Sequence, residues 1–390
     1  MVYWKGNFSK MKVLSVFGTR PEAIKMCPLV KQLEVADGIE SFVCLTGQHR
    51  EMLQQVIDIF KIRVDYQLDI MRPKQTLTTI TCDVLEKIQS VYEEISPDIV
   101  LVHGDTSTSF VAALAAFYLQ IPVGHVEAGL RTYDPYSPFP EEMNRTLTGH
   151  IATIHFCPTE RNRQNLEREG ITKNVFVTGN TVIDSFATTV RPGYQYKHPG
   201  LREVPEWKAS GKRVVLVTAH RRENLGKPLE NICEAIKELH DKYKDLIFIY
   251  PVHLNPVVQE TAHRILDNLE RVRLIDPVDV EDLHNLMSQC YLVMTDSGGL
   301  QEEAPAFGVP VLVLRTETER PEAVDAGTVI VVGVEKKNIV NEAETLLTNK
   351  KKYEAMSKAI NPYGDGTASF IISKAIQEQF QISNIKARMS

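Results

Sequence analysis

The sequence lacks the features that mark membrane, secreted and nucleic-acid-binding proteins. No apolar run approaches the length of about 20 residues that a membrane-spanning helix needs, and the N-terminus has no charged-then-apolar signal pattern. The six cysteines are scattered without a C-x-x-C pair, which favours reduced thiols. The 50 acidic residues outnumber the 44 Lys and Arg, and this balance disfavours binding to a phosphate backbone. We therefore expect a cytoplasmic protein with no membrane or nucleic-acid partner.

Motifs of several common site types are absent as well. The sequence contains no G-x-G-x-x-G dinucleotide fingerprint, no G-K-[ST] phosphate loop, no H-E-x-x-H and no G-x-S-x-G. Its histidines and cysteines have no zinc-ligand spacing, so no metal site is expected. Carboxylates and His220 are then the groups left for acid–base chemistry.

Apolar, β-branched runs alternate with helical patterns over almost the whole chain of 390 residues. Short buried strands that alternate with helices predict an α/β fold with parallel sheets of right-handed βαβ units. The pattern lapses over residues 194–212, a polar stretch typical of a linker, and then restarts. We expect two doubly wound domains, residues 11–190 and 205–366, with an inter-domain cleft that receives a ligand at the carboxyl ends of the strands. Residues 1–10 are expected to be a leader without fixed structure.

Polar residues gather where the predicted strands end, which is where an α/β protein holds its site. In "FGTRPEAIK", Arg20 and Lys25 stand near the positive end of a predicted helix, and this loop suits an anion. The alternative is a plain turn with solvated charges. In "VHGDTSTS", Asp105 is either the cap of a helix or a site residue.

The stretch "HVEAGLRTYDPYSPFPEEMNR" places carboxylates directly behind a predicted buried strand. The strand would deliver Glu127, and a loop with three prolines would carry Glu141 to the same edge of the sheet. Glu142 is expected to be the structural partner of an arginine.

The second half of the chain repeats this arrangement. "VTAHRREN" ends a strand with His220 and Arg221, which suit a phosphate or, alternatively, form a solvated surface cluster. In "TDSGGLQEEAPAFG", a strand runs into residues 297–299 at the start of a helix, where free backbone amides let a phosphate approach. Glu303 follows for ribose hydroxyls, and "TERPEAV" supplies Arg320 near the same edge. The alternative for this motif is a tight strand–helix turn.

A set of motifs carries a resemblance to a known family: "FGTRPEAIKM", "HGDT", "HVEAGLR", "PEEMNR", "TAHRREN", "YPVHLNP", "TDSGGLQEEAP", "TERPEAV" and "NPYGDG". In this order, over nearly the whole chain from Met11, the sequence resembles the non-hydrolysing UDP-N-acetylglucosamine 2-epimerases of bacteria. The resemblance implies a GT-B fold, with two Rossmann-like domains and a C-terminal helix, residues 367–386, that returns to the N-terminal domain. It also implies a homodimer, with no nicotinamide cofactor and no metal.

The implied reaction is reversible inversion at C2 between UDP-GlcNAc and UDP-ManNAc, which supplies precursors of cell-surface polysaccharides. The C2 proton is not acidic, because no carbonyl lies beside it. Anti elimination of UDP to 2-acetamidoglucal, followed by re-addition, avoids this difficulty. Such a route needs a base, an acid on the opposite face, and cations that hold UDP.

Residue roles follow from the resemblance by motif match. The implied acid–base residues are Asp105, Glu127 and Glu141, with His220 at the diphosphate or the leaving oxygen. The implied substrate-binding residues are Arg20 and Lys25 for the sugar and phosphates, Ser297, Gly298 and Gly299 for the diphosphate, Glu303 for the ribose, Arg320 for the nucleotide, and Val278 and Leu283 for the uracil.

Several members of the family bind a second UDP-GlcNAc as an activator. The positions that match this second site are Gln48, Glu141, Arg221 and His253. Glu51 and Lys74 also fall within it, where some members have Gln and Arg.

Three alternative functions share parts of this pattern. A hydrolysing epimerase would release UDP and free ManNAc. A GT-B glycosyltransferase would move the sugar to an acceptor, and the carboxylates of "HVEAGLR" and "PEEMNR" disfavour it. A nucleotide-sugar sensor without catalysis is disfavoured because every expected acid–base residue is present.

Overall fold

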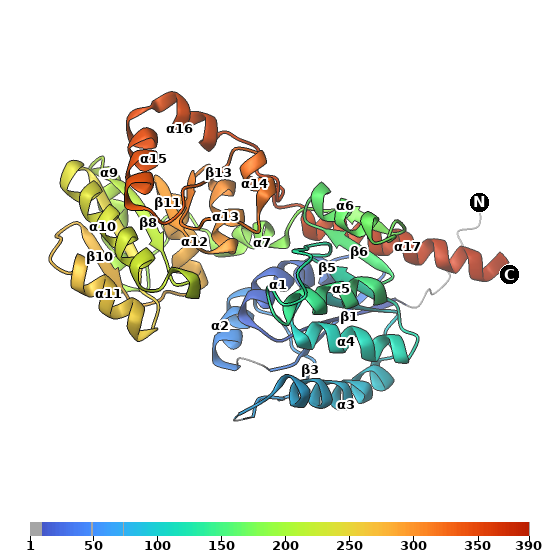
Figure 1. Ribbon diagram of the computed structural model, residues 1–390. Coiled ribbons are helices and arrows are strands. Elements are labelled where there is room, and N and C mark those ends of the chain that lie inside the picture. The colour runs from blue at the N-terminus through green and yellow to red at the C-terminus, as the bar shows by residue number, and fades with distance from the viewer. Residues whose placement is uncertain (1–9, 48–49, 73, 390) are drawn as a thin grey trace. The chain divides into compact units, whose positions relative to one another are not determined.

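The computed structural model describes residues 10–47, 50–72 and 74–389. The chain forms two compact units, which Figure 1 colours along the sequence. Unit 1 contains the described residues up to Thr188 and those from Tyr363 onward, and unit 2 is Thr189–Pro362. The predicted leader lies outside the described residues, apart from Lys10.

Unit 1 is built on a seven-stranded sheet in the order β3-β2-β1-β4-β5-β6-β7, with every neighbouring pair parallel. Its strands are β1 (Met11–Phe17), β2 (Ile39–Leu45), β3 (Tyr66–Gln67), β4 (Ile99–His103), β5 (Val123–Val126), β6 (Ile154–Cys157) and β7 (Val175–Val177). Its helices are α1 (Arg20–Glu34), α2 (Arg50–Phe60), α3 (Leu77–Ile95), α4 (Ser107–Tyr118), α5 (Glu141–Ile151), α6 (Glu160–Arg168), α7 (Thr181–Asp184) and α17 (Ala368–Met389), with α8 (Phe186–Thr189) at the junction with unit 2.

Helices cover both faces of this sheet, which explains why its strands are continuous apolar runs. In β1, Val13 and Phe17 join the core formed with α1 and α2, whereas Leu14 and Val16 join the core formed with α3 and α4. A strand that is buried on both faces gains from apolar residues at successive positions rather than at alternate ones.

The last helix of the chain, α17, belongs to unit 1 and is the red helix of Figure 1. Ile372, Ala375 and Ile376 lie on one face of this helix and pack into the same core as α1 and α2. The helix thus closes a core whose other members lie more than 200 positions earlier in the sequence.

Unit 2 repeats the design with six parallel strands in the order β10-β9-β8-β11-β12-β13. Its strands are β8 (Arg213–Thr218), β9 (Leu246–Pro251), β10 (Val272–Ile275), β11 (Leu292–Thr295), β12 (Val311–Val313) and β13 (Val329–Val331). Its α-helices are α9 (Val204–Ala209), α10 (Lys227–Lys242), α11 (Pro256–Leu266), α12 (Val280–Gln289), α13 (Gly298–Glu303), α14 (Pro321–Asp325), α15 (Lys336–Thr348) and α16 (Lys350–Ser357). Two doubly wound, Rossmann-like parallel sheets confirm the predicted fold class.

The stretch 194–212 is not a linker, and that prediction was wrong. Asp282 of α12 accepts hydrogen bonds from the Tyr194 hydroxyl at 2.9 Å and from the backbone N–H groups of Lys197 at 3.0 Å and His198 at 2.8 Å. Leu201 and Val204 are fully buried. A buried carboxylate and a few apolar anchors therefore fasten this polar segment to unit 2.

Among the described residues, no helix combines the length and the apolar composition that crossing a membrane would require.

Gly129, two residues after the predicted site residue Glu127, should tolerate no side chain. It has a φ of +90°, and a Cβ there would lie 2.2 Å from the carbonyl oxygen of Asn162 in α6. Gly170 is a matched control, because its φ is +81° but nothing lies within 4 Å of its Cβ position. We expect Gly170→Ala to lower the free energy of unfolding by about 1 kcal/mol, and Gly129→Ala by more than about 3 kcal/mol.

Urea denaturation of the two variants measures this difference. Equal losses in the two variants would show that backbone conformation alone, without the contact to α6, determines the cost.

Candidate functional site

The carboxylate of Glu22 joins two of the loops that follow strands of unit 1. Thr19 and Glu22 form the capping box at the start of α1, in which Glu22 Oε2 accepts a hydrogen bond from the Thr19 N–H at 2.7 Å. Glu22 Oε1 accepts hydrogen bonds from the hydroxyls of Thr106 at 2.7 Å and Ser109 at 2.8 Å. This buried side chain thereby fixes the loop after β1 against the loop after β4 that carries Asp105.

Glu127 lies at the carboxyl end of β5 in a left-handed backbone conformation, with a φ of +63°. Its Oε2 accepts a hydrogen bond from the Asn180 side chain at 2.8 Å and forms an ion pair with Lys25. Nε2 of His103 lies 3.7 Å from the same oxygen. Burial lowers the pKa of His103, against the opposing effect of Glu127. Segments after β1 and β7 and the last residue of β4 therefore meet at one carboxylate.

Asp105 is held by Arg145 of α5, whose Nη2 lies 2.8 Å from Oδ2 of the carboxylate. The pKa of Asp105 is raised to about 6: burial raises it most, the charge of Arg145 opposes the rise, and the charges of Glu127 and Glu141 add to it. The exposed fraction of the Asp105 side chain is 29%, so a ligand can reach the carboxylate. A carboxyl group with a pKa in this range exchanges protons readily near neutral pH, as acid–base catalysis requires.

The loop between β5 and α5 is fixed by Glu142. Its Oε1 accepts hydrogen bonds from the backbone N–H groups of Thr132 at 3.0 Å and Tyr133 at 2.9 Å, and its Oε2 lies 3.5 Å from Nη1 of Arg145. The structural role predicted for this residue, as the partner of an arginine, is confirmed. Glu141, the first residue of α5, is half-buried beside it.

In unit 2, Asp296 organises the loop after β8. It follows β11, is fully buried, and accepts hydrogen bonds on Oδ2 from the backbone N–H groups of His220 at 2.7 Å and Arg221 at 2.8 Å. The His220 ring stacks on that of His253 with 5.2 Å between centroids and 5° between planes. Burial lowers the pKa of His220, and Asp296 opposes this effect.

Two guanidinium groups lie close to the backbone of Gly298. A Cβ at this position would lie 3.7 Å from Cζ and Nη2 of Arg320 and 3.9 Å from Nη2 of Arg221. Arg320 is itself held by an ion pair with the buried carboxylate of Glu302. Positive charge beside a backbone without side chains is suited to binding an anion such as a phosphate.

The carboxylate of Glu303 is held by His284. Nε2 of His284 lies 3.3 Å from Oε2 of Glu303, and Nδ1 of His284 is 2.8 Å from the Thr189 hydroxyl. Val278 and Leu283, predicted near the uracil, are half-buried at the entry and in the first turns of α12. The predicted residues of unit 2 thus all lie in segments that follow strands.

The predicted activator residues are only partly described. Gln48 lies outside the described residues, and of Glu51 only the backbone, in α2, is described. Lys74 is exposed with a φ of +59°. Arg221 and His253 lie beside the predicted substrate residues of unit 2.

Sequence reasoning missed several residues of these clusters: Glu22, His103, Arg145 and Asn180 in unit 1, and His284 and Asp296 in unit 2. Glu22 carried a detectable signal, the T-x-x-E capping box before an apolar run. Asp296 directly follows a buried strand and precedes the Ser-Gly-Gly turn, which is a weaker signal.

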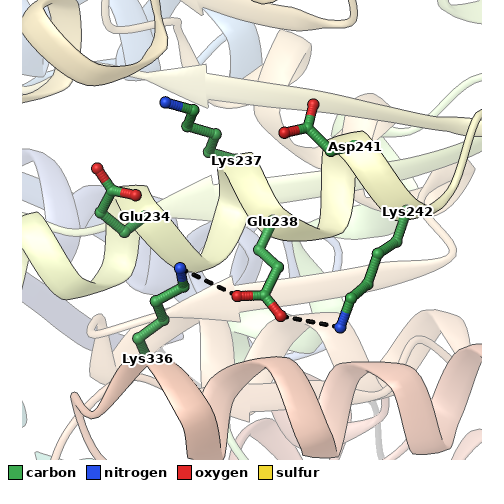
Figure 2. A pocket seen from close by; sticks show the side chains of 6 residues that line it. All are labelled: Glu234, Lys237, Glu238, Asp241, Lys242 and Lys336. Carbon is green, nitrogen blue, oxygen red and sulfur yellow. Dashed lines mark ion pairs between the residues drawn. The ribbon is translucent and has the colours of Figure 1, made fainter.

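A pocket of about 330 Å³ lies elsewhere on unit 2, between α10 and α15 (Figure 2). Glu238 at its centre forms ion pairs with Lys242 at 2.8 Å and Lys336 at 3.0 Å. Because these charges neutralise one another, we assign the pocket no role. In the described ranges, no three His, Cys, Asp or Glu side chains are grouped so as to hold a metal ion.

Two Rossmann-like units of this kind, with polar residues gathered after the strands, define a protein of the GT-B class. A family model described as UDP-N-acetylglucosamine 2-epimerase matches residues 31–377. The chain belongs to this family.

Individual relatives agree with this assignment. The UDP-N-acetylglucosamine 2-epimerase of Bacillus subtilis is 54% identical over 361 residues, which cover 92% of this chain and 93% of the relative. The protein of the same name from Escherichia coli K12 is 52% identical over 377 residues, 94% of this chain and 98% of the relative. The crystal structure of UDP-GlcNAc 2-epimerase from Neisseria meningitidis bound to UDP-GlcNAc superposes with a TM-score of 0.83 at 47% identity and covers 94% of this chain and 100% of that chain.

The raised pKa of Asp105, about 6, predicts a pH-dependent stability. An unfolded Asp has a pKa near 3.9, so between about pH 4 and 6 the folded state binds more protons than the unfolded state. The contribution of Asp105 to the free energy of unfolding is therefore present at low pH and is lost as the pH rises through the pKa of the folded state. The free energy of unfolding of Asp105→Asn minus that of the wild type should therefore be larger at pH 7 than at about pH 4.5, by about 1–2 kcal/mol.

Urea titrations at the two pH values measure this change. Arg145→Gln should steepen the wild-type slope, because the charge of Arg145 opposes the rise in pKa. A constant difference between Asp105→Asn and wild type at both pH values would contradict the assignment.

Proposed function

We propose that the protein interconverts UDP-GlcNAc and UDP-ManNAc by reversible inversion at C2, without net release of free sugar. Membership of the UDP-N-acetylglucosamine 2-epimerase family supports the substrate class. One observation carries the assignment of the chemistry to unit 1. Asp105, Glu127 and Glu141 come from three separate segments, and the charges of Glu127 and Glu141 add to the effect of burial, which raises the pKa of Asp105 to about 6.

The proposed reaction is an elimination followed by its reverse. A carboxylate takes the C2 proton, the C–H electron pair forms the C1–C2 double bond, and the C1–O bond breaks with its electron pair on UDP. A carboxyl group then protonates C2 from the other face while UDP re-adds at C1. The base and the acid come from Asp105, Glu127 and Glu141. This series of steps needs two groups with exchangeable protons.

In this proposal unit 2 retains UDP while the sugar is cleaved from it. Arg320, the backbone at residues 297–299 and His220 bind the diphosphate, because cationic side chains and free amides stabilise its charge. Glu303 binds the ribose hydroxyls. Val278 and Leu283 line the uracil. In unit 1, Arg20 and Lys25 approach the sugar and phosphates, and Lys25 also balances the charge of Glu127.

Three points stay predictions: activation by a second UDP-GlcNAc, assembly as a homodimer, and a role in supplying precursors of cell-surface polysaccharide.

Incubation with UDP-GlcNAc in D₂O tests the proposed reaction. Exchange at C2 is required if the proton leaves during turnover, so both UDP-sugars should acquire deuterium at C2, as followed by ¹H NMR. Free ManNAc as the main stoichiometric product would assign a hydrolysing epimerase instead. Absence of C2 exchange by well-folded protein would remove the epimerase assignment.

Isosteric variants separate chemistry from binding in the same assay. Asp105→Asn and Glu127→Gln should lose on the order of 10²–10⁴-fold in turnover. Both should still bind UDP in calorimetric titration, since their carboxylates act at the sugar. Glu160→Gln, on the exposed surface of α6, is the matched control and should keep wild-type turnover.

A further inference from the structure

The two oxygens of Asp296 have different surroundings. Oδ2 accepts hydrogen bonds from the backbone of His220 and Arg221 and, at 3.0 Å, from the side chain of Asn224. Oδ1 is buried and accepts no hydrogen bond from any residue that the structure describes. Nδ1 of His220 lies 3.5 Å from this oxygen.

A buried carboxylate oxygen without a donor is costly, because it has lost its water and gained nothing in return. The nearby hydroxyls do not supply the donor: those of Thr218 and Thr295 lie 2.5 Å from each other, and Thr295 also accepts from the Ser297 N–H at 2.9 Å. The His220 ring is the group directed at Oδ1. A separation of 3.5 Å exceeds a normal N–H···O bond by only a few tenths of an ångström, so a small ring movement closes it.

We propose that Asp296 is a positioning residue that keeps the proton of His220 on Nδ1, so that Nε2 is the nitrogen that gives and takes a proton at the bound diphosphate. The role of Nε2 rests on the proposed function; the position of the proton does not. An ionised carboxylate is an acceptor only, so a neutral ring that faces it must present N–H on that side. When Nε2 is protonated, the same carboxylate stabilises the imidazolium.

His253 lies over one face of the His220 ring. Its Nδ1 accepts a hydrogen bond from the backbone N–H of Asn255 at 3.1 Å, so when neutral this ring carries its proton on Nε2. The two rings are 5° from parallel with 5.2 Å between their centroids, and Nδ1 of His220 is directed at Asp296.

The charged groups around His220 are Asp296, which raises its pKa, and His253 and Arg221, which lower it. Burial lowers the pKa most, so the ring is neutral near pH 7 before an anion binds. A diphosphate beside Nε2 favours the protonated ring. When the C1–O bond breaks, the electron pair stays on the β-phosphate oxygen and the Nε2 proton transfers to it; re-addition returns the proton.

The tautomer of His220 tests this proposal. In nucleotide-free protein labelled with ¹⁵N-histidine, at a pH of 7 or above, long-range ¹H–¹⁵N correlation should show a neutral His220 with its proton on Nδ1, assigned by comparison with His220→Gln. Asp296→Asn keeps an oxygen for the backbone donors but turns an amide N–H₂ toward Nδ1. The proton should then move to Nε2, and kcat should fall on the order of 10²–10⁴-fold, with the KM for UDP-GlcNAc nearly unchanged.

Asn224→Ala is the matched control for loosened structure. It removes a donor to Oδ2 and leaves Oδ1 and His220 as they are, so the tautomer should stay on Nδ1 and kcat should fall less than about 10-fold.

Two results would overturn the proposal. One is a proton on Nε2 of neutral His220 in the wild type, a measurement that requires no variant to fold. The other is Asp296→Asn with wild-type kcat or an unchanged tautomer. Failure of the proposed function is distinguishable, because an inactive protein with the Nδ1 proton would retain the Asp296–His220 pair and lose only the epimerase assignment.

Discussion

Unit 1 is arranged around the charge of Glu127. A carboxylate with 11% of its side chain exposed, on a residue with positive φ, is unfavourable in backbone conformation and in solvation. Lys25 and Asn180 offset these costs by an ion pair and a hydrogen bond, and they come from elements that are adjacent because the parallel sheet brings strand ends together. The fold thereby supplies compensating donors to this carboxylate. The cores on the two faces of the sheet make that arrangement rigid.

Unit 2 uses the same principle with a different result. Asp296 follows a central strand and collects backbone donors from the neighbouring loop, as a buried carboxylate must. Its effect is to fix His220 and Arg221 beside Gly298 and Arg320, where cationic groups gather. Buried carboxylates thus hold an ion-paired cluster in unit 1 and a cationic cluster in unit 2. In the proposed reaction, proton transfer at the sugar accompanies departure of the negatively charged UDP.

The sequence predicted what depends on local pattern. Continuous apolar strands and intervening helices gave the fold class, and polar residues after strands located Asp105 and Glu127 at strand ends. Contacts between residues that are distant in the sequence could not be predicted from a local pattern. Asn180 donates a hydrogen bond to Glu127, 53 positions away, and Tyr194 donates one to Asp282, 88 positions away. The second contact explains why a polar, proline-containing stretch was wrongly predicted as a linker. The composition of a segment indicates whether that segment by itself favours water. It does not show that a buried carboxylate elsewhere in the chain binds the segment.

In the proposed reaction, the C1–O bond to UDP breaks and re-forms while C2 is inverted. This bond cleavage is tested most directly with UDP-GlcNAc that carries ¹⁸O in the oxygen bridging C1 and the β-phosphorus. In free UDP the terminal oxygens of the β-phosphate become equivalent by rotation. If the bond breaks in this way, recovered UDP-GlcNAc should contain ¹⁸O in non-bridging β-phosphate positions, as seen by ³¹P NMR, on the time scale of epimerisation. Complete epimerisation with all of the ¹⁸O still in the bridge would contradict it.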